Sequence, residues 1–293
     1  MHNIYSWWLY FKLQCNNKIF TNIINSPFLK IYIPSFFVFK RTTEEDNIIQ
    51  IIPWDNPWIK KTGSRFLIVY NMETSIEDII TLIEYCCSYF RQKKWIYSIH
   101  WSAISYNDIG ILLWWSISWI WKTSTAINLC KKQWFSFIGD ETIYITDKWK
   151  IIDWSKMILF NKPSMFTYLN NSFHNTNIKN NWIPTTTNKV ALKIMIQPII
   201  CSWWKFESII RNDIKRTFHL YEEFSRRIRW CSRLINNRSI PIQSIDDKSI
   251  SKKRILCCKK IANETIAYTL KWSMNKILNE IKKITLSLSL END

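Results

Sequence analysis

Tryptophan stands in this chain at positions where the backbone of a turn or a helix end normally requires glycine. Trp149 lies between two short alternating runs, in the place of a hairpin turn that needs a positive φ angle. Trp134 follows a helical stretch, where a glycine commonly ends the helix. Trp54, Trp58 and Trp182 occur in turn-forming clusters of Pro, Asn and Asp. The pattern indicates a backbone that needs glycine where the sequence has tryptophan.

The glycine content leads to the same conclusion. The chain has 18 Trp and only 3 Gly among 293 residues, whereas a chain of this length normally needs roughly 20 glycines. We infer that most of the tryptophans stand for glycine in the living protein, as happens when a bacterium reads UGA codons as glycine and the translation writes tryptophan. A truly Trp-rich chain is the alternative, and it leaves the glycine deficit unexplained. The sequence does not say which of the 18 are genuine.

Length and charge set broad bounds. A chain of 293 residues forms one large domain or two modest ones. The net charge of +17 would suit nucleic acid or another polyanion. However, Lys, Ile and Asn are abundant together, as expected of an AT-rich genome, and we favour that explanation. A nucleotide-phosphate site would use some of the same charge.

Cysteine usage and the amino-terminal sequence favour a reduced cytoplasm. The eight Cys form no C-x-x-C pair, so a metal or disulfide framework is not expected. The first residues lack the charged segment and cleavage site of a signal peptide. The apolar stretch 109 to 121 is too short to span a bilayer.

The hydrophobic pattern predicts an α/β protein with three regions. Residues 1–73 are β-rich, 74–204 hold a P-loop kinase-like core with a mixed central sheet, and 205–293 read as helical. The expected strands of the first region are the runs WLYFKL, KIFTNII, FLKIYIPSFFVF, NIIQII and RFLIVYN.

The central region alternates helices and strands. A helix capped by Thr74 or Ser75 is expected up to residue 94. Strand 109–113, helix 122–132 and strand 135–139 should follow one another, with strand 135–139 beside strand 109–113 and Lys122 near Asp140 at one edge of the sheet. The polar residues 155 to 189 read as a loop.

The sequence predicts a phosphate-binding loop when glycine is placed at the Trp positions. The stretch ILLWWSISWIWKTSTAINL then reads ILLGGSISGIGKTSTAINL, a strand, a tight loop and the start of a helix. Lys122 would reach the β- and γ-phosphates, and the Thr123 hydroxyl would hold Mg²⁺. The strict motif places its first glycine at Ser116, so the first turn is slightly off pattern. The expected nucleotide-binding residues are Ser116, Ile117, Ser118, Trp119, Ile120, Trp121, Lys122, Thr123 and Ser124.

The surrounding 50 residues, 96 to 145, resemble the catalytic core of HPr kinase/phosphorylase and the related phosphoenolpyruvate-carboxykinase-like ATPases. That family has a His-Gly on the strand before the loop, here His100-Trp101. It also has paired acids after the next strand, here Asp140-Glu141. The resemblance says little about residues 1 to 90 or 210 to 293.

The resemblance implies roles for three catalytic residues. Asp140 takes the place of the general base, close to the metal. Glu141 stands where a second Asp is common, and His100 matches the histidine near the γ-phosphate. Without the resemblance, Asp140-Glu141 would read as the start of a surface hairpin and His100 as a core histidine. With it, we expect His100 on a strand beside 109–113, facing the same crevice as Lys122 and Asp140. His174 and His219 read as structural.

These features predict an ATP-dependent kinase of the HPr-kinase-like group that uses Mg²⁺. It would transfer the γ-phosphate to a hydroxyl of a protein serine or a small molecule. A non-catalytic nucleotide-sensing module is the first alternative, with Glu141 and Ser116 as signs of decay. A basic nucleic-acid-binding protein is the second, supported by the charge alone. Neither nucleic acid nor a membrane is an expected partner, and a homo-oligomer is left open.

Overall fold

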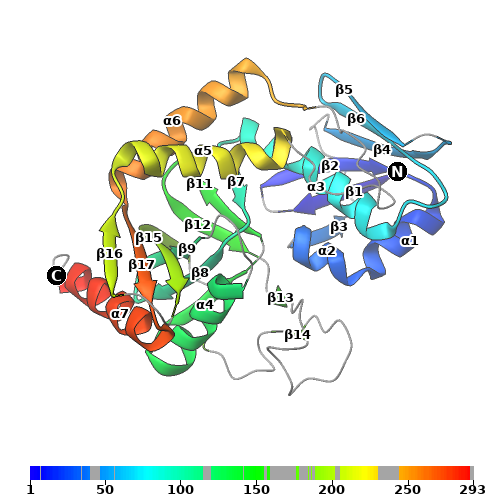
Figure 1. The fold of residues 1–293 in the computed structure, drawn as a ribbon. Helices are drawn as coiled ribbons and strands as arrows, with labels where there is room; N and C mark the ends of the chain where they lie inside the picture. Colours follow the sequence, from blue (N-terminus) through cyan, green and yellow to red (C-terminus); the bar gives the residue numbers. More distant parts are fainter. Residues whose placement is uncertain are drawn as a thin grey trace. The chain divides into compact units, whose positions relative to one another are not determined.

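The structure is a computed structural model, and it is mixed α/β with mixed sheets (Figure 1). The residues that it describes are 1–6, 8–33, 35–39, 47–55, 57–114, 120–140, 142–154, 157–158, 176–177, 184, 186, 189–201, 205–229 and 244–290.

The chain divides into two compact units. The first contains Met1–Ser98 and Tyr221–Leu256, and the second contains Ile99–Leu220 and Cys257–Asp293. This division differs from the three consecutive regions expected from sequence, because each unit combines an early and a late part of the chain. Helices α5 (Asp213–Arg229) and α6 (Lys248–Glu264) each contribute to both units.

The first unit contains a six-stranded sheet in the order β3-β1-β2-β4-β6-β5. Strands β2, β4 and β6 run parallel, and the other pairings are antiparallel. The strands are β1 (His2–Ser6), β2 (Leu9–Gln14), β3 (Phe36–Phe39), β4 (Ile48–Pro53), β5 (Trp58–Thr62) and β6 (Arg65–Tyr70). Helix α3 (Ile76–Lys93) packs against β2 and β6, and Ser75 caps it by accepting from the Asp78 amide, as predicted.

Two expected strands of this unit are helices instead. Helix α1 (Asn17–Asn25) replaces the run KIFTNII, and α2 (Pro27–Tyr32) replaces the start of FLKIYIPSFFVF. The Asn16 side chain caps α1 by accepting from the Ile19 amide across 2.8 Å. Pro27 opens α2 at the position where a missing N–H costs nothing. These local end signals decided the structure, because short apolar runs do not separate helix from strand.

The second unit is built on strands β9 (Ile109–Leu113), β15 (Val190–Ile200) and β17 (Ile266–Trp272), which run parallel to one another. β8 continues this sheet beyond β9, and β10 lies beside β8. The remaining strands are β7 (Ile96–Ile99), β8 (Ser102–Tyr106), β10 (Ser136–Gly139), β11 (Ile143–Thr146), β12 (Lys150–Trp154), β13 (Met157–Ile158), β14 (Thr176–Asn177) and β16 (Glu207–Ile210).

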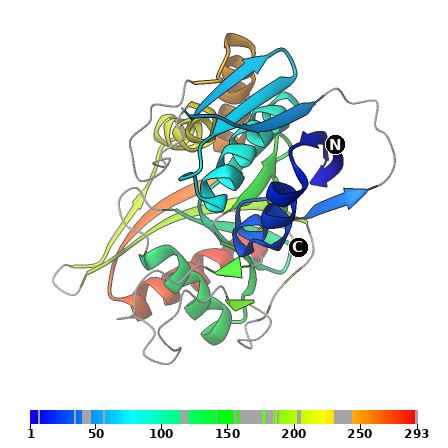
Figure 2. The ribbon, with the colours of Figure 1, turned by 90° about the vertical axis from the view of Figure 1, so that its right-hand side faces the viewer.

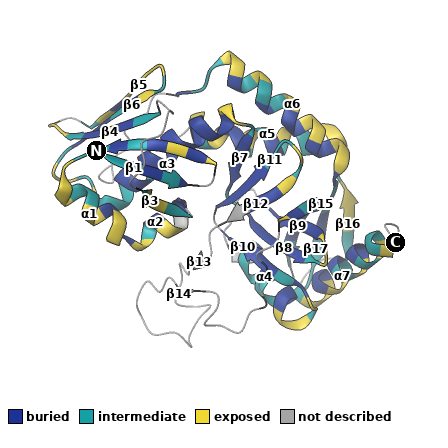
Figure 3. Ribbon diagram, turned by 180° about the vertical axis from the view of Figure 1, so that it is seen from behind, coloured by how far each residue is buried: buried dark blue, intermediate teal, exposed yellow. Residues whose placement is uncertain are grey.

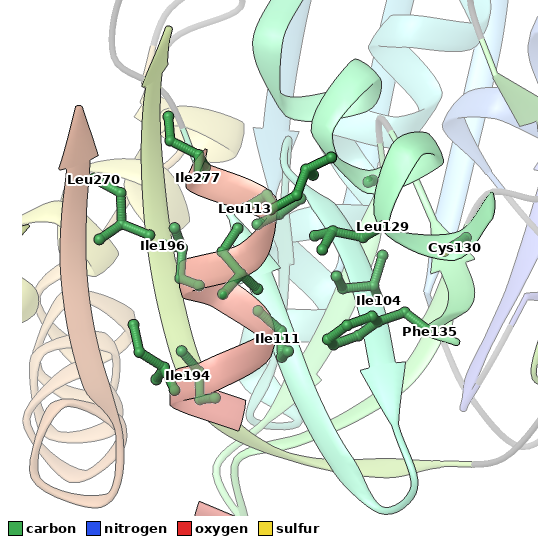
Figure 4. Close-up of a cluster of buried hydrophobic side chains, with 14 of the residues drawn as sticks. Ile104, Ile111, Leu113, Leu129, Cys130, Phe135, Ile194, Ile196, Leu270 and Ile277 are labelled. Atoms are coloured by element: carbon green, nitrogen blue, oxygen red, sulfur yellow. The ribbon is translucent and has the colours of Figure 1, made fainter. Parts of the chain in front are cut away.

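Helices α4 (Ile120–Lys132) and α7 (Met274–Leu290) lie side by side across one face of this sheet (Figure 2). Alternate strand residues such as Ile111, Leu113 and Ile196 point from the sheet toward these helices. There they pack with Leu129 of α4 and Ile277 of α7 (Figure 4). Burying each such side chain contributes about 1.5–3 kcal/mol. In Figure 3 the strands of this sheet are largely buried, whereas the helices that cover it have both buried and exposed residues.

The carboxy-terminal region is not wholly helical, which corrects the sequence-based prediction. β16 and β17 interrupt it. Residues Ile266–Trp272 are rich in β-branched and aromatic side chains, and β17 pairs with β15 over its whole length. This long-range pairing is invisible in the local apolar stripe. No helix in the described part of the chain is both long and apolar enough to cross a membrane.

Gly110 lies where β9 and β15 approach each other closely. A Cβ atom at this residue would lie 2.8 Å from the carbonyl oxygen of Ala191 on β15. The close approach of the two strands therefore requires glycine here, one strand residue before the apolar run that leads into the loop.

Four tryptophans have the left-handed backbone that glycine favours. Their φ angles are 58° for Trp8, 60° for Trp95, 66° for Trp134 and 45° for Trp149. A side chain in this region costs on the order of 1 kcal/mol or more. Trp134 is also 86% exposed, an unusual environment for an indole. Apart from these four tryptophans, the described residues with a positive φ are Ser35, Asn107 and Gly63.

Candidate functional site

The elements predicted around the loop are all present. β9 covers the expected strand 109–113, α4 contains the expected helix 122–132, and β10 covers most of 135–139. One detail differs, since β10 neighbours β8 and not β9. The hairpin β8–β9 turns at Asn107, whose φ is 50°.

Asp140 lies at the end of β10, and its carboxylate is completely buried. Oδ2 accepts from the hydroxyl of Thr123 across 2.7 Å, and Oδ1 accepts from the hydroxyl of Ser102 across 2.5 Å. Within the described part of the chain, no Lys, Arg or His side chain forms an ion pair with it. Both donors are neutral hydroxyls, and each carboxylate oxygen keeps a lone pair that a metal ion could use.

Lys122 lies in the first turn of α4 and is 5% exposed. Its Nζ donates to the backbone carbonyl of His100 across 2.8 Å. That partner is neutral, so the ammonium charge is held in a buried position without a described carboxylate to balance it. Lys122 and Thr123 are sequence neighbours, and Thr123 contacts Asp140. The structure therefore brings the predicted pair Lys122 and Asp140 to the same end of α4.

His100 corrects the prediction in part. It is not on a strand beside β9 but in the link between β7 and β8, and the described contact is that of its carbonyl with Lys122. It remains beside the start of α4. The neighbouring Trp101 is 1% exposed, and its ring centroid lies 6.0 Å from that of Trp114. Neither buried indole Nε1 atom has a hydrogen-bond partner among the residues that the structure describes, which is unfavourable for a polar atom.

Ser102 is a site residue that sequence reasoning missed. β10 pairs with β8 so that Gly139 lies opposite Ala103. Asp140, which follows Gly139, and Ser102, which precedes Ala103, are therefore neighbours. This explains the contact between their side chains. Only the antiparallel register of two strands far apart in sequence reveals it.

The loop itself lies outside the described residues. This applies to 115–119, which include the predicted residues Ser116, Ile117, Ser118 and Trp119, and also to Glu141 and His174. For Ile120 and Trp121 only the helical backbone is described. The carbonyl of Ser124 accepts from Asn128 within α4 across 2.8 Å.

His219 of α5 lies beside the residue that follows β9. Its ring centroid is 4.4 Å from that of Trp114. Burial lowers the pKa of this imidazole, and the positive charges of Arg211 and Lys215 lower it further. No local pattern in the sequence connects this histidine with Trp114, because their contact joins two distant parts of the chain.

Comparisons with known proteins do not add to this geometry. No protein-family model matches the chain, and no curated protein sequence matches it.

The oxygen atoms at this site fit a magnesium ion. Mg²⁺ prefers hard oxygen ligands, and in nucleotide sites it takes only one or two from the protein and the rest from phosphates and water. The Thr123 hydroxyl and the Asp140 carboxylate supply two such oxygens side by side. The described residues contain no group of three or more His, Cys, Asp or Glu that could hold a metal ion.

Proposed function

We propose that this chain is an ATP- and Mg²⁺-dependent phosphotransferase of the HPr-kinase-like group, which transfers the γ-phosphate to a hydroxyl. The contact between Thr123 and Asp140, next to a buried and uncompensated Lys122, carries the proposal. It joins a hydroxyl, a carboxylate and an ammonium group at the start of a helix that follows a parallel strand. Phosphate-loop enzymes use this combination.

Lys122 and the amino-terminal end of α4 bind the phosphates in this proposal. The first amides of a helix point at the ligand, and the helix dipole favours negative charge there. The carbonyl of His100 holds the Lys122 ammonium in place before the nucleotide arrives. When the nucleotide binds, this ammonium donates to phosphate oxygens in addition to, or in place of, the His100 carbonyl. The contact with phosphate is charge-assisted and therefore stronger.

Asp140 has two tasks. With Thr123 it would hold Mg²⁺, which when bound would neutralise phosphate charge. Asp140 also accepts the proton of the attacking hydroxyl, as the family resemblance implies. The hydrogen bond from Ser102 orients the carboxylate for this proton transfer. Glu141 follows directly in sequence and is the second candidate acid.

Glycine at most Trp positions is part of the proposal. The positive φ angles of Trp8, Trp95, Trp134 and Trp149 support it. The two buried indole nitrogens of Trp101 and Trp114, which lack partners, support it at the site itself. The coding DNA provides a direct check: UGA at most of the 18 Trp codons is expected, and UGG at most of them removes the basis of the loop assignment.

The decisive experiment compares two proteins, the chain as written and a chain with Gly at Trp119 and Trp121. Phosphate loops need close backbone approach to the ligand, which an indole at these positions obstructs. We expect the glycine version to bind ATP–Mg²⁺ far more tightly in calorimetry. Equal affinities would contradict the proposal.

Turnover separates the kinase from the nucleotide-sensing alternative. The glycine version should consume ATP in the presence of Mg²⁺ and a hydroxyl acceptor, and mass spectrometry should find a phosphoryl group on the acceptor. A protein that binds ATP tightly with no consumption across candidate acceptors would favour the sensing module. Steep loss of nucleic-acid binding with salt would favour the third function.

A further inference from the structure

Strand β16 lies at an open edge of the sheet in the second unit. Among the described strands it pairs with β17, and it lies outside β17 in Figure 1. Another edge strand of this sheet, β10, is covered, because the Phe137 amide donates to the Pro184 carbonyl across 2.6 Å and the Thr186 amide donates to the Phe137 carbonyl across 3.1 Å. In the described part of the chain, no backbone group covers the outer edge of β16 in this way.

The register of β16 shows which of its backbone groups face this edge. The Arg211 amide donates to the Ala267 carbonyl across 2.8 Å, so these two residues form a hydrogen-bonded pair of the antiparallel ladder. Such pairs alternate along a strand, and the backbone groups of Ile209 therefore also face β17. The N–H and C=O groups of Ser208 and Ile210 point the other way, where another strand can pair with them.

Apolar side chains are exposed along the same edge and in the helix that follows it. Ile209 and Ile210 of β16 are 41% and 65% exposed, and Ile214 and Phe218 of α5 are 73% and 61% exposed. Ile214 and Phe218 are four residues apart and lie on one face of the helix. Burial of this group of side chains would contribute to association, because apolar surface is removed from water.

The sequence of β16 contains nothing that opposes the addition of a strand. Proteins commonly protect sheet edges with lysine or proline. β5, an edge strand of the first unit, carries Lys60 and Lys61. Glu207–Ile210 contains neither residue type. Four residues form few backbone hydrogen bonds, so the exposed apolar side chains have to supply a large part of the affinity.

The segment Glu207–Arg211 reads ESIIR and is complementary to itself. When two copies pair antiparallel with Ile209 opposite Ile209, Ser208 lies opposite the partner's Ile210 and forms a hydrogen-bonded pair with it. These are the residues whose backbone groups face the edge. The same register places Glu207 opposite the partner's Arg211 at both ends, and opposite charges across two strands stabilise their pairing.

Both charged side chains keep atoms for this second contact. Oε2 of Glu207 accepts from Lys271 across 2.8 Å, and Arg211 donates through Nε to Thr269 across 2.8 Å and through Nη2 to Gln197 across 3.3 Å. Oε1 of Glu207 and Nη1 of Arg211 take part in no hydrogen bond within the described part of the chain. Pairing with a second copy therefore does not require the existing contacts to break.

We propose that β16 is the interface between two copies of this chain, which pair antiparallel around a two-fold axis at Ile209. The two sheets then form one continuous sheet, and each copy contributes the same surface, as a two-fold axis requires. The inference goes beyond the proposed function and does not depend on it, because ATP, Mg²⁺ and the phosphate-binding loop take no part in the pairing.

The first test measures the mass of the full chain in solution by sedimentation over a range of concentrations. We expect a dimer. Ile209→Lys should weaken dimerisation at least about tenfold, because it places two like charges opposite each other. Leu290→Lys, at a 77% exposed residue of α7, is the matched control and should dimerise like the parent. A parent that stays monomeric at every concentration overturns the inference, and so does a dimer that Ile209→Lys leaves intact.

A second test checks the register and also decides the matter if Ile209→Lys fails to fold. The Cα atoms of a non-hydrogen-bonded pair are about 4.5 Å apart, within the range of about 4.4–6.8 Å that a disulfide spans. Ile209→Cys should therefore form a disulfide-linked dimer on mild oxidation, visible on a non-reducing gel. Ser208→Cys is the control, because this register separates the two Ser208 residues by two further positions along the strands, beyond disulfide reach. The parent, with its native cysteines, should not cross-link. Failure of Ile209→Cys to cross-link, or equal cross-linking of Ser208→Cys, contradicts the proposed pairing.

Discussion

The hydroxyl of Thr123 donates to Oδ2 of Asp140 across 2.7 Å and thereby connects the first turn of α4 to the end of β10. The same carboxylate accepts from Ser102, at the start of β8. Three elements thus converge on one buried acid. In the proposed function, a carboxylate placed this way holds a metal beside the helix start and takes a proton from a hydroxyl.

Lys122→Ala should weaken both ATP binding and turnover, by tenfold or more each, in the protein with glycine at the Trp positions. The ammonium faces the phosphates in the ground state and in the transition state, so both quantities fall together. Calorimetry and phosphate-transfer rates provide the measurement. Lys132→Ala, at the exposed last residue of the same helix, is the control. Wild-type affinity in the Lys122 variant would remove this lysine from the site.

Asp140→Asn should lower turnover by at least about 100-fold and change ATP affinity less. The amide cannot accept the hydroxyl proton, although loss of a metal contact also weakens Mg²⁺-dependent binding. Steady-state rates across a Mg²⁺ titration separate the two effects. Asp108→Asn changes an exposed aspartate in the β8–β9 turn and should have no effect. Undiminished turnover in the Asp140 variant contradicts the catalytic assignment.

Trp134→Gly should stabilise the chain as written, by roughly 1 kcal/mol, because it relieves a side chain held at a φ of 66°. Trp58→Gly is the matched control. Trp58 is also exposed, but it lies in β5 opposite Val69 and not in the turn that the surrounding Pro, Asn and Asp predicted, so that prediction was wrong here. Glycine at this position weakens a strand. Urea denaturation should show opposite shifts of the midpoint. Destabilisation by both substitutions would argue that Trp134 is a genuine tryptophan.

Local signals predicted the parts of the fold that depend on neighbouring residues. The Ser75 cap and the acidic first turn of α3 are such signals, and so is the succession of β9 and α4. The prediction was wrong where a short apolar run was ambiguous, as in α1, or where distant pairing decided the structure, as in β17. β17 exists because β15 offers it a parallel partner, which no local pattern records.

The same difference between local signals and distant pairing applies to the candidate site. Lys122, Thr123 and Asp140 were predictable, because the spacing of the loop, helix and next strand is a property of one continuous segment. Ser102 was not, because its contact with Asp140 depends on the register of β8 and β10.

Gly110→Ala should destabilise the protein by about 1–3 kcal/mol, since the new Cβ would meet the Ala191 carbonyl at 2.8 Å and force two central strands apart. Gly63 provides the contrast. It has open space around it but a φ of 62°, so Gly63→Asn should be tolerated, because asparagine accepts this backbone region. Chemical denaturation of both variants gives the comparison. Equal stability of Gly110→Ala and the parent would mean that β9 and β15 are not packed this closely.

His219→Gln should make the stability of the chain as written less sensitive to acid. Burial, with the charges of Arg211 and Lys215, lowers the pKa of His219 below its ordinary 6.5, so the unfolded state binds the proton more readily. The parent therefore loses stability as the pH falls below 6.5, and retains it above. The variant lacks this titratable imidazole. Its free energy of unfolding should therefore fall less steeply between about pH 6.5 and 5. His2, whose pKa is also lowered, is present in both proteins and cancels in the difference. Parallel pH profiles of denaturation midpoints would mean that His219 titrates alike in the folded and unfolded chains, and that the positive field beside Trp114 is absent.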